Sequence, residues 1–160
     1  MGSVVRMGLL RDTVLRFALT VFRLLPRRLR IIIVSVIAPS FTVGAIVVLR
    51  RGESVLLLRQ RHHPAWTLPG GLMKRGEAPS ACVRREVREE LGVDVAIPDV
   101  PAAVLVEGSR IDVVFVTDWL YGDSPVVPHD VEVLEGRWFA RSALPMLTGP
   151  TVRALAAVLV

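Results

Sequence analysis

Residues 31–49 form a run of nineteen residues without a charged side chain. A helix of this length could cross a bilayer, so this run decides between a membrane span and a globular fold. Pro39 and Gly44 interrupt its middle, and its second half is rich in β-branched residues, which favour strands over helices. We therefore predict a short helix near 27–38, a break after it, and a buried strand over 42–50.

The rest of the chain alternates between strand patterns and helix patterns. Two apolar runs on either side of a turn at 51–53 predict a β-hairpin. After the first strand we predict a strand at 54–60, a loop at 61–70 ending in a short extended piece, a helix at 77–92, strand-like sequence with proline breaks at 93–107, a strand at 111–120, a loop at 121–130, a strand at 131–139 and a closing helix at 151–159. This order predicts an α/β fold with helices packed against a central sheet.

The N-terminal segment differs in charge from the rest of the chain. Residues 1–30 hold seven arginines and one acid, a net charge of +6, whereas the remaining residues have a net charge of −1. Apolar residues recur at helical spacing over 4–25. We therefore predict a basic amphipathic helical extension at 1–38 and a core domain at 39–160.

Two kinds of surroundings would cover the apolar face of this extension. In the first, which we favour, the extension packs against the core domain or against a second subunit in a homodimer. In the second, it makes peripheral contact with an anionic membrane surface. No small-residue cleavage site follows its apolar run, so we expect no signal peptide. The expected location is cytoplasmic, or peripheral to the membrane if the extension binds lipid.

Length, charge and cysteine content exclude several classes of protein. A chain of 160 residues suits one domain with a modest core. Its excess positive charge lies in the extension, so the high overall charge says little about the rest of the chain, and we expect no stable binding of nucleic acid. Cys82 is the single cysteine, which rules out a disulfide within the chain and, without a recognisable acid–base partner, predicts a packing role.

Three glutamates lie on the predicted helix at 77–92. Glu89 and Glu90 follow Glu86 by three and four residues, so the three carboxylates can converge on one helix face. Like charges held close together repel, and a hard cation such as Mg²⁺, bound through oxygen ligands, would offset the repulsion. The alternative is a solvated face on which neighbouring arginines pair with the glutamates.

The spacing around these glutamates favours the metal interpretation. The sequence reads Gly71, five residues, Glu77, seven residues, Arg85-Glu86-Val87, one residue, Glu89-Glu90, one residue, and Gly92-Val93. At every defined position it resembles the signature of the Nudix hydrolase superfamily (MutT-like). The lead-in at 66–71 and the segment at 132–139 resemble the family as well. The additional motifs of its coenzyme A, ADP-ribose, diadenosine polyphosphate and NADH groups are not matched, which leaves the substrate open.

The resemblance carries expectations about fold and chemistry. It implies an α/β/α sandwich with a mixed β-sheet, in which residues 71–93 form a loop–helix–loop. It also implies Mg²⁺-dependent hydrolysis of a phosphoanhydride (pyrophosphate) bond in a nucleoside diphosphate linked to another moiety, by metal-activated water, with Mn²⁺ as a substitute metal. A small-molecule nucleoside diphosphate derivative is the expected partner. The alternative is a non-catalytic Nudix-fold module that binds or senses a nucleotide.

The resemblance assigns the metal ligands residue by residue. Glu86 and Glu90 match the main metal ligands of the family. Glu89 matches a further ligand that can also activate water, and the carbonyl group of Gly71 is expected to coordinate the metal as well.

It also assigns residues that support catalysis. Arg85 matches a residue that pairs with the position of Glu77 and orients the glutamates, which is a positioning role. The general base remains open, because family members use either a glutamate of the signature or an acid from a later segment. Glu89, Glu132 and Glu135 are the candidates.

Several residues near the signature have weaker expectations. Arg59, Arg61, His62 and His63 precede it and could contact a substrate phosphate, although loop histidines are more often merely exposed. Trp66 could stack on a base, but we expect it to form part of the core or of a cavity wall.

Overall fold

The computed structural model describes residues 16–17, 19–38, 40–122 and 126–159. The chain divides into two compact units, Met1–Ser40 and Phe41–Val160. The predicted domain boundary, between residues 38 and 39, lies close to this division and stays a prediction.

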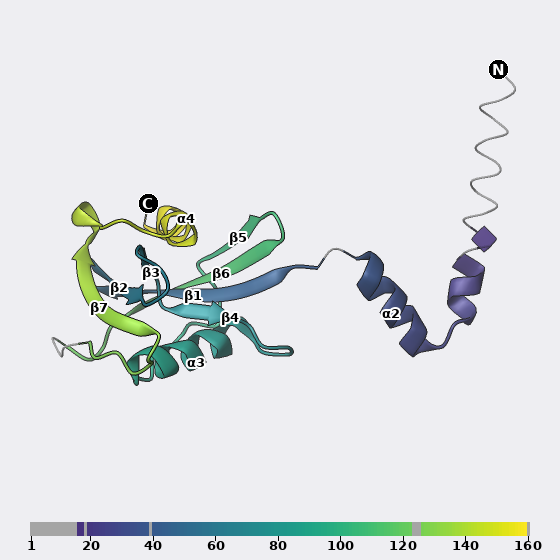
Figure 1. The fold of residues 1–160 in the computed structure, drawn as a ribbon, viewed down its shortest axis with the longest axis horizontal. Helices are drawn as coiled ribbons and strands as arrows, with labels where there is room; N and C mark the ends of the chain where they lie inside the picture. The colour runs from purple at the N-terminus through teal and green to yellow at the C-terminus, as the bar shows by residue number, and fades with distance from the viewer. Residues whose placement is uncertain (1–15, 18, 39, 123–125, 160) are drawn as a thin grey trace, which may run out of the picture. The chain divides into compact units, whose positions relative to one another are not determined.

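The described part of the first unit is helical. Residues 19–24 are helical, and α2 spans Arg27–Ile37 after Pro26 (Figure 1). The predicted helix near 27–38 is thus present, while residues 1–15 of the predicted extension lie outside the described residues. None of the described helices is long and apolar enough to cross a membrane. Large apolar side chains are exposed in this unit at Phe17, Leu19, Val21, Leu24, Leu29, Ile31, Ile32, Val34 and Val36.

The second unit is built around a seven-stranded sheet. The path through the sheet is β3-β2-β1-β6-β5, with β4 paired to β1 and β7 paired to β2. The strands are β1 (Thr42–Arg51), β2 (Ser54–Gln60), β3 (Trp66–Thr67), β4 (Gly70–Leu72), β5 (Ala103–Glu107), β6 (Arg110–Asp118) and β7 (Val133–Ala140), and the helices are α3 (Pro79–Leu91), α4 (Gly149–Val158) and the short 3₁₀ helix η1 (Arg141–Ala143).

The sheet is mixed, because β1 runs parallel to β6 and antiparallel to β2 and β4. The register of the parallel pair places Gly44 beside Asp112, and β4 brings Gly71 beside Ala45. Segments that are far apart in the sequence therefore meet at the start of β1. The predicted α/β fold with a mixed sheet is confirmed.

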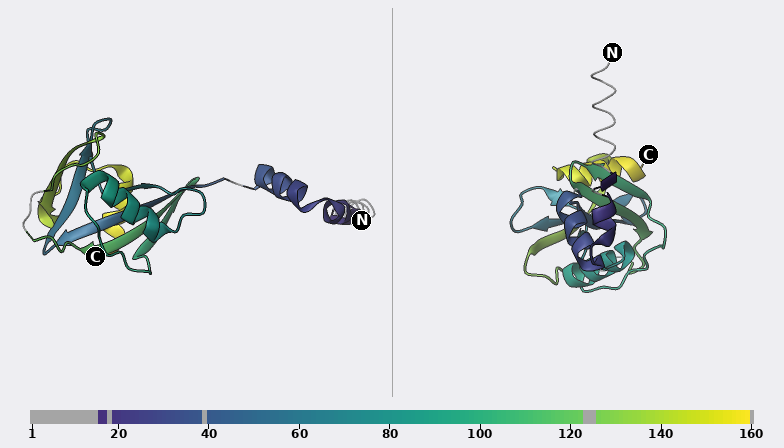
Figure 2. Two further views of the ribbon diagram at one scale, coloured as in Figure 1. Left: turned by 90° about the horizontal axis from the view of Figure 1, so that it is seen from below. Right: turned by 90° about the vertical axis from the view of Figure 1, so that its right-hand side faces the viewer.

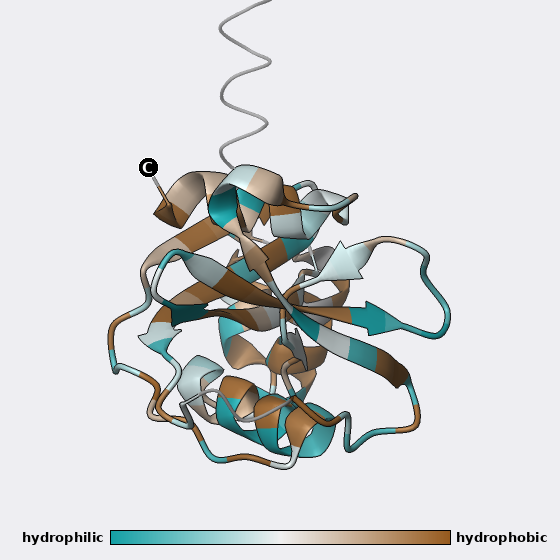
Figure 3. Ribbon diagram, turned by 90° about the vertical axis from the view of Figure 1, so that its left-hand side faces the viewer, coloured by the Kyte–Doolittle hydropathy of each residue, from teal (hydrophilic) through white to brown (hydrophobic). Residues whose placement is uncertain are grey.

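The sheet lies between two helices, α3 on one face and α4 on the other (Figure 1). Figure 2 shows α3 across the strands when the second unit is seen from below. Successive side chains of β1 point to opposite faces of the sheet. Val47 packs in the hydrophobic cluster that contains Val83 and Val87 of α3, called here the α3-side cluster. Val48 packs in the cluster that contains Ala154 and Leu155 of α4, called here the α4-side cluster. Both valines are fully buried, as expected for a strand covered on both sides. In Figure 3, α3 carries apolar residues as well as hydrophilic ones.

Helix α3, Pro79–Leu91, lies within the predicted range of 77–92 and is slightly shorter at both ends. Pro79 occupies its first turn, where a proline needs no hydrogen-bond partner for its nitrogen. Gly92 ends it in the left-handed conformation, with φ of 67°, and its N–H donates to the carbonyl of Arg88. These two residues fix the length of the helix and hence the positions of the glutamates on it.

The strand-like expectation for residues 93–107 is wrong for most of that range. Only β5 forms there, and residues 93–102 adopt no regular structure. The apolar side chains of Val93, Val95 and Ile97 pack into the α3-side cluster. Their alternation reflects burial of a loop and not pairing in a sheet.

Candidate active site

A cavity of about 670 Å³ opens where β4, α3, the start of β6, the segment before β7 and the beginning of α4 come together. Acidic side chains dominate its charged lining: Glu86 and Glu90 come from α3, and Asp130 and Glu132 come from the segment before β7. A pocket of this size suits a small-molecule ligand.

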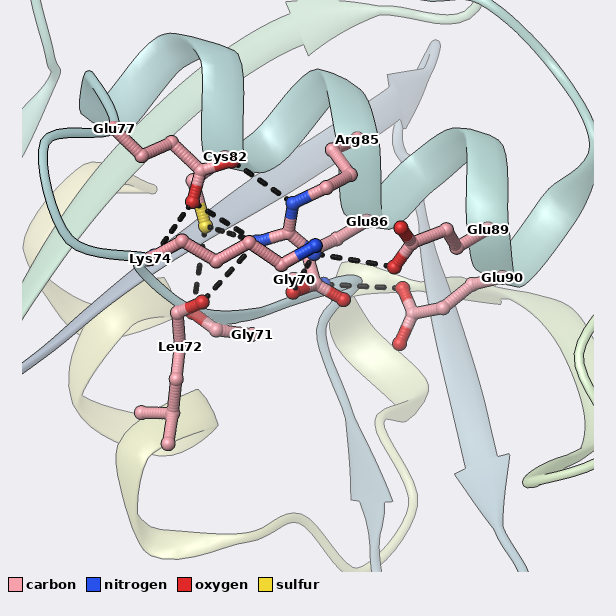
Figure 4. A network of polar contacts seen from close by, with 10 residues as sticks. All are labelled: Gly70, Gly71, Leu72, Lys74, Glu77, Cys82, Arg85, Glu86, Glu89 and Glu90. Atoms are coloured by element: carbon pink, nitrogen blue, oxygen red, sulfur yellow. Dashed lines mark hydrogen bonds and ion pairs between the residues drawn. The ribbon is translucent and has the colours of Figure 1, made fainter.

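Arg85 links three glutamates of the predicted signature. Its Nη1 atom lies 2.7 Å from Oε1 of Glu86 and 3.1 Å from Oε2 of Glu89. Its Nη2 atom also donates to the carbonyl oxygen of Leu72, at 3.2 Å. Figure 4 shows the guanidinium group of Arg85 between Glu77 on one side and the two other glutamates on the other. One arginine therefore ties helix α3 to the loop that follows β4.

Glu77 receives two hydrogen bonds from Arg85, at 2.9 Å from Nε and 3.0 Å from Nη2. The backbone N–H of Lys74 donates a third, at 2.8 Å. The bonds from Arg85, followed by the bond from Lys74, lower the pKa of Glu77 to about 2. Glu77 is therefore ionised at neutral pH and holds both the arginine and the loop before the helix.

Glu86 and Glu89 differ in exposure although both contact Arg85. The side chain of Glu86 is 17% exposed, whereas that of Glu89 is 48% exposed. The carboxylate of Glu86 reaches within 2.5 Å of the position that a Cβ on Gly71 would occupy. A residue with a Cβ at position 71 would therefore displace this carboxylate from the backbone of β4.

Glu90 is a buried acid, with only 6% of the residue exposed. The backbone N–H of Gly70 donates to its Oε2 atom at 3.1 Å. Burial raises the pKa of Glu90 to about 8; the charges of Glu86 and Asp130 act in the same direction, and the hydrogen bonds from Gly70 and Gln60 oppose the rise. In the described ranges, none of the ion pairs includes Glu90.

The described residues contain no group of three or more histidine, cysteine, aspartate or glutamate side chains already gathered to hold a metal ion. Arg85 occupies the space between Glu86 and Glu89 and forms an ion pair with each. The convergence of all three glutamates therefore stays a prediction. The buried carboxylate of Glu90, which lacks a cationic partner among the described residues and lines the same cavity as Glu86, fits a divalent cation.

The candidates for a general base lie in different surroundings. Glu132 lines the cavity, and its backbone N–H donates to Asp130 at 2.7 Å, which fixes the turn before β7. Glu135 forms ion pairs with Arg59, at 3.0 Å, and with Arg137. Glu135 is not among the described residues that line the cavity.

Other residues considered from the sequence occupy defined places. His62 and His63 line the cavity. Trp66 packs edge-on against Phe139, with ring centroids 4.8 Å apart, and thus contributes to the core on the α4 side. Cys82 is fully buried in the other core cluster, and burial raises the pKa of its thiol to about 11, which is consistent with packing.

Sequence reasoning missed several residues of the cavity wall. Asp130, Thr148 and Thr151 line it from segments that follow the signature by many residues, and Arg110 lines it from the start of β6. No local pattern distinguishes these residues from ordinary surface positions. The pairing of β1 with β6, the pairing of β2 with β7 and the return of α4 to the sheet bring them to the cavity.

Comparison with known proteins identifies the family. The family model described as the NUDIX domain matches residues 40–157. The chain therefore belongs to the Nudix family, and the predicted superfamily membership is confirmed. A NAD-capped RNA hydrolase, NudC, from Pseudomonas aeruginosa is 33% identical over 121 residues, which cover 74% of this chain and 42% of that protein. The chain thus spans less than half the length of this curated relative.

Solved structures agree with the fold. A MutT NUDIX hydrolase from Burkholderia pseudomallei is 28% identical and superposes with a TM-score of 0.62, covering 73% of this chain and 97% of that one. A NUDIX hydrolase from Nitrosomonas europaea is 25% identical, with a TM-score of 0.62 and coverage of 72% and 68%. The predicted Nudix-type sandwich is therefore confirmed.

Proposed function

We propose that this protein is a Mg²⁺-dependent hydrolase that cleaves a phosphoanhydride bond in a nucleoside diphosphate linked to another moiety. One observation carries the proposal: Glu90 is a buried carboxylate without a cationic partner among the described residues, beside Glu86, on the wall of a ligand-sized cavity. Burying an uncompensated carboxylate is costly, and a bound divalent cation offsets this cost. Membership of the Nudix family supports the same chemistry.

The proposed metal ligands are Glu86, Glu90, Glu89 and the carbonyl oxygen of Gly71. When bound, Mg²⁺, or Mn²⁺ in its place, supplies a Lewis acid that offsets phosphate charge and makes water a better nucleophile at neutral pH. All four groups come from β4 and α3, which are in contact. Because hard cations prefer oxygen donors, this donor set fits magnesium better than a soft metal.

Arg85 and Glu77 act as positioning residues in this proposal. Glu77, held ionised by its hydrogen bonds, fixes the guanidinium group of Arg85, which in turn orients Glu86 and Glu89. For the general base, the cavity position of Glu132 and the exposure of Glu89 favour these two over Glu135, which is engaged by two arginines.

The proposed substrate class is a nucleoside diphosphate derivative of moderate size. The cavity volume of about 670 Å³ supports a small molecule. The relative from Pseudomonas aeruginosa is named for hydrolysis of NAD-capped RNA, and NAD contains a phosphoanhydride between two nucleosides. We propose a cytoplasmic location; peripheral membrane contact by residues 1–38 and a homodimer stay predictions.

A substrate panel tests the proposal. It should contain NAD, NAD-capped RNA, ADP-ribose, nucleotide sugars, dinucleoside polyphosphates and oxidised nucleotides, each incubated with Mg²⁺, with Mn²⁺ and with EDTA. We expect cleavage of at least one of them into two phosphorylated products with either metal, and none with EDTA. Binding of a panel member without turnover in any buffer would instead favour the non-catalytic nucleotide-binding module.

A further inference from the structure

Arg110, at the start of β6, lines the same cavity as the glutamates of α3. Among the described residues it is the only lysine or arginine in the lining, whereas the carboxylates there number four: Glu86, Glu90, Asp130 and Glu132. A ligand with several negative charges needs cationic groups in such a wall. Arg110 is therefore the side chain on which recognition of an anionic ligand would most depend.

The guanidinium group of Arg110 is anchored by a buried partner. Asp112, two residues along β6, is 5% exposed and accepts hydrogen bonds from Nε of Arg110 at 3.0 Å to Oδ1 and 2.9 Å to Oδ2. Both bonds use the Nε atom, so within the described part of the chain the two terminal nitrogens keep their hydrogens for another acceptor. An arginine fixed by one edge loses less side-chain entropy when its other edge binds a ligand.

The glycine at position 44 makes room for this pair. A Cβ on Gly44 would lie 2.6 Å from Oδ1 of Asp112, 3.2 Å from Nη2 of Arg110 and 3.4 Å from the carbonyl oxygen of Gly71. The same point thus adjoins a free end of the arginine and the carbonyl group proposed as a metal ligand. Nη2 of Arg110 and the carbonyl oxygen of Gly71 therefore both lie close to Gly44.

The acid nearest to Arg110 on the neighbouring strand has another partner. Glu107 lies opposite Arg110 in the pairing of β5 with β6, but it forms an ion pair with Arg153 of α4. Asp112 is the acid that forms an ion pair with Arg110 in the described ranges. Arg110, which lines the cavity, therefore shares no ion pair with Glu107 among the described residues.

We propose that Arg110, held in place by Asp112, binds a phosphate group of the nucleoside diphosphate substrate. This inference rests on the proposed function and names a residue that recognises the substrate. A guanidinium edge offers two parallel N–H groups, which match two oxygens of one phosphate. Arg110 is a binding residue in this role, and Asp112 is a positioning residue.

Binding of a substrate analogue that cannot be cleaved tests the inference. The probes are α,β-methylene-ADP and inorganic pyrophosphate, titrated calorimetrically into the full chain in buffer with Mg²⁺ and in buffer with EDTA. The test variant combines Arg110→Met with Asp112→Asn, so that no unpaired charge stays buried. The matched control combines Arg50→Met with Asp118→Asn, because Arg50 of β1 and Asp118 of β6 also form an arginine–aspartate ion pair, at 3.0 Å, and neither residue lines the cavity.

The test variant should bind α,β-methylene-ADP about 10- to 100-fold more weakly than the wild type, as expected for loss of charge-assisted hydrogen bonds. The control should bind like the wild type. Arg110→Lys, which keeps the charge near Asp112 but offers no planar edge, should also bind more weakly. Thermal unfolding of each variant, followed by circular dichroism, checks that the fold is retained.

The inference would be overturned if Arg110→Lys and a folded test variant both bound α,β-methylene-ADP with the affinity of the wild type. It would also be overturned if the wild type bound neither probe in either buffer. Failure of the proposed function would give a different set of results. In that case no panel compound is cleaved with metal, while binding in EDTA still depends on Arg110.

Discussion

Replacing the buried Glu90 by glutamine should stabilise the metal-free protein at neutral pH. Glutamine has nearly the same shape and can still accept the hydrogen bond from the N–H of Gly70, but it carries no charge to desolvate. The wild-type carboxyl has its pKa raised by burial from 4.5 to about 8. Its contribution to stability is therefore fully present below about pH 4.5 and is lost as the pH rises through about 8.

The size of the effect follows from the two pKa values. Between them, the unfolded chain releases the proton of Glu90 while the folded protein keeps it, so each pH unit removes about 1.4 kcal/mol of stability. From pH 5 to pH 7 the wild type should lose about 2–3 kcal/mol through this group. The Glu90→Gln variant lacks this loss, so its advantage over the wild type should grow by the same amount.

Urea unfolding in EDTA at pH 5 and at pH 7, followed by circular dichroism, measures this difference. Glu53→Gln is the matched control, because the side chain of Glu53 is 86% exposed and charging it in the folded protein costs little solvation. The control should follow the wild type at both pH values. If Glu90→Gln differed from the wild type by the same free energy at pH 5 and pH 7, the burial argument for Glu90 would be refuted.

Three further predictions concern the neighbours of the site and the core. Arg85→Lys, which loses the fork that contacts Glu77, Glu86 and the carbonyl of Leu72, should bind Mn²⁺ about 10- to 100-fold more weakly in a fluorescence or calorimetric titration; unchanged affinity would contradict the positioning role. Cys82 should react with a thiol reagent at pH 8 at least about 100-fold more slowly in the native protein than in urea, because burial raises its pKa from 9.0 to about 11; equal rates would mean that the thiol is accessible. Leu49→Ala, which empties a fully buried position, should lower the free energy of unfolding by about 2–5 kcal/mol, and a loss below about 1 kcal/mol would argue against the packing described.

The helix of the signature could be predicted because its limits are encoded locally. Pro79 and Gly92 mark its ends through their own backbone preferences, independently of the rest of the fold. The break after residue 38 and the strand that follows were predictable for the same reason. Strand β1 is apolar on both faces, so its burial could also be inferred from sequence.

Residues 93–102 show where local reasoning fails. Val93, Val95 and Ile97 alternate with other residues in the manner of a strand, yet they pack against α3 without strand partners. Alternation reports which side chains are buried, and it cannot report whether a neighbouring strand is available for pairing.

In the site, too, some residues could be predicted from the sequence and others could not. Glu86 and Glu90 could be singled out because their spacing on one helix follows a family pattern. Arg110 could not be placed at the cavity, and Glu132 could be named only as one of three candidate bases, because their positions depend on strand pairings over long sequence separations. The ion pairs of Arg85 with Glu86 and Glu89 also depend on side-chain geometry that spacing alone does not determine.

Metal binding and turnover measured on the same preparations test the proposed chemistry. Mn²⁺ binding should be followed by electron paramagnetic resonance, and Mg²⁺-dependent cleavage with the best substrate of the panel, for the wild type, Glu86→Gln and Glu53→Gln. We predict that Glu86→Gln loses tight Mn²⁺ binding and on the order of 1000-fold or more in turnover, while Glu53→Gln retains both. Wild-type metal affinity and turnover in Glu86→Gln would contradict the assignment of a metal-dependent hydrolase to this site.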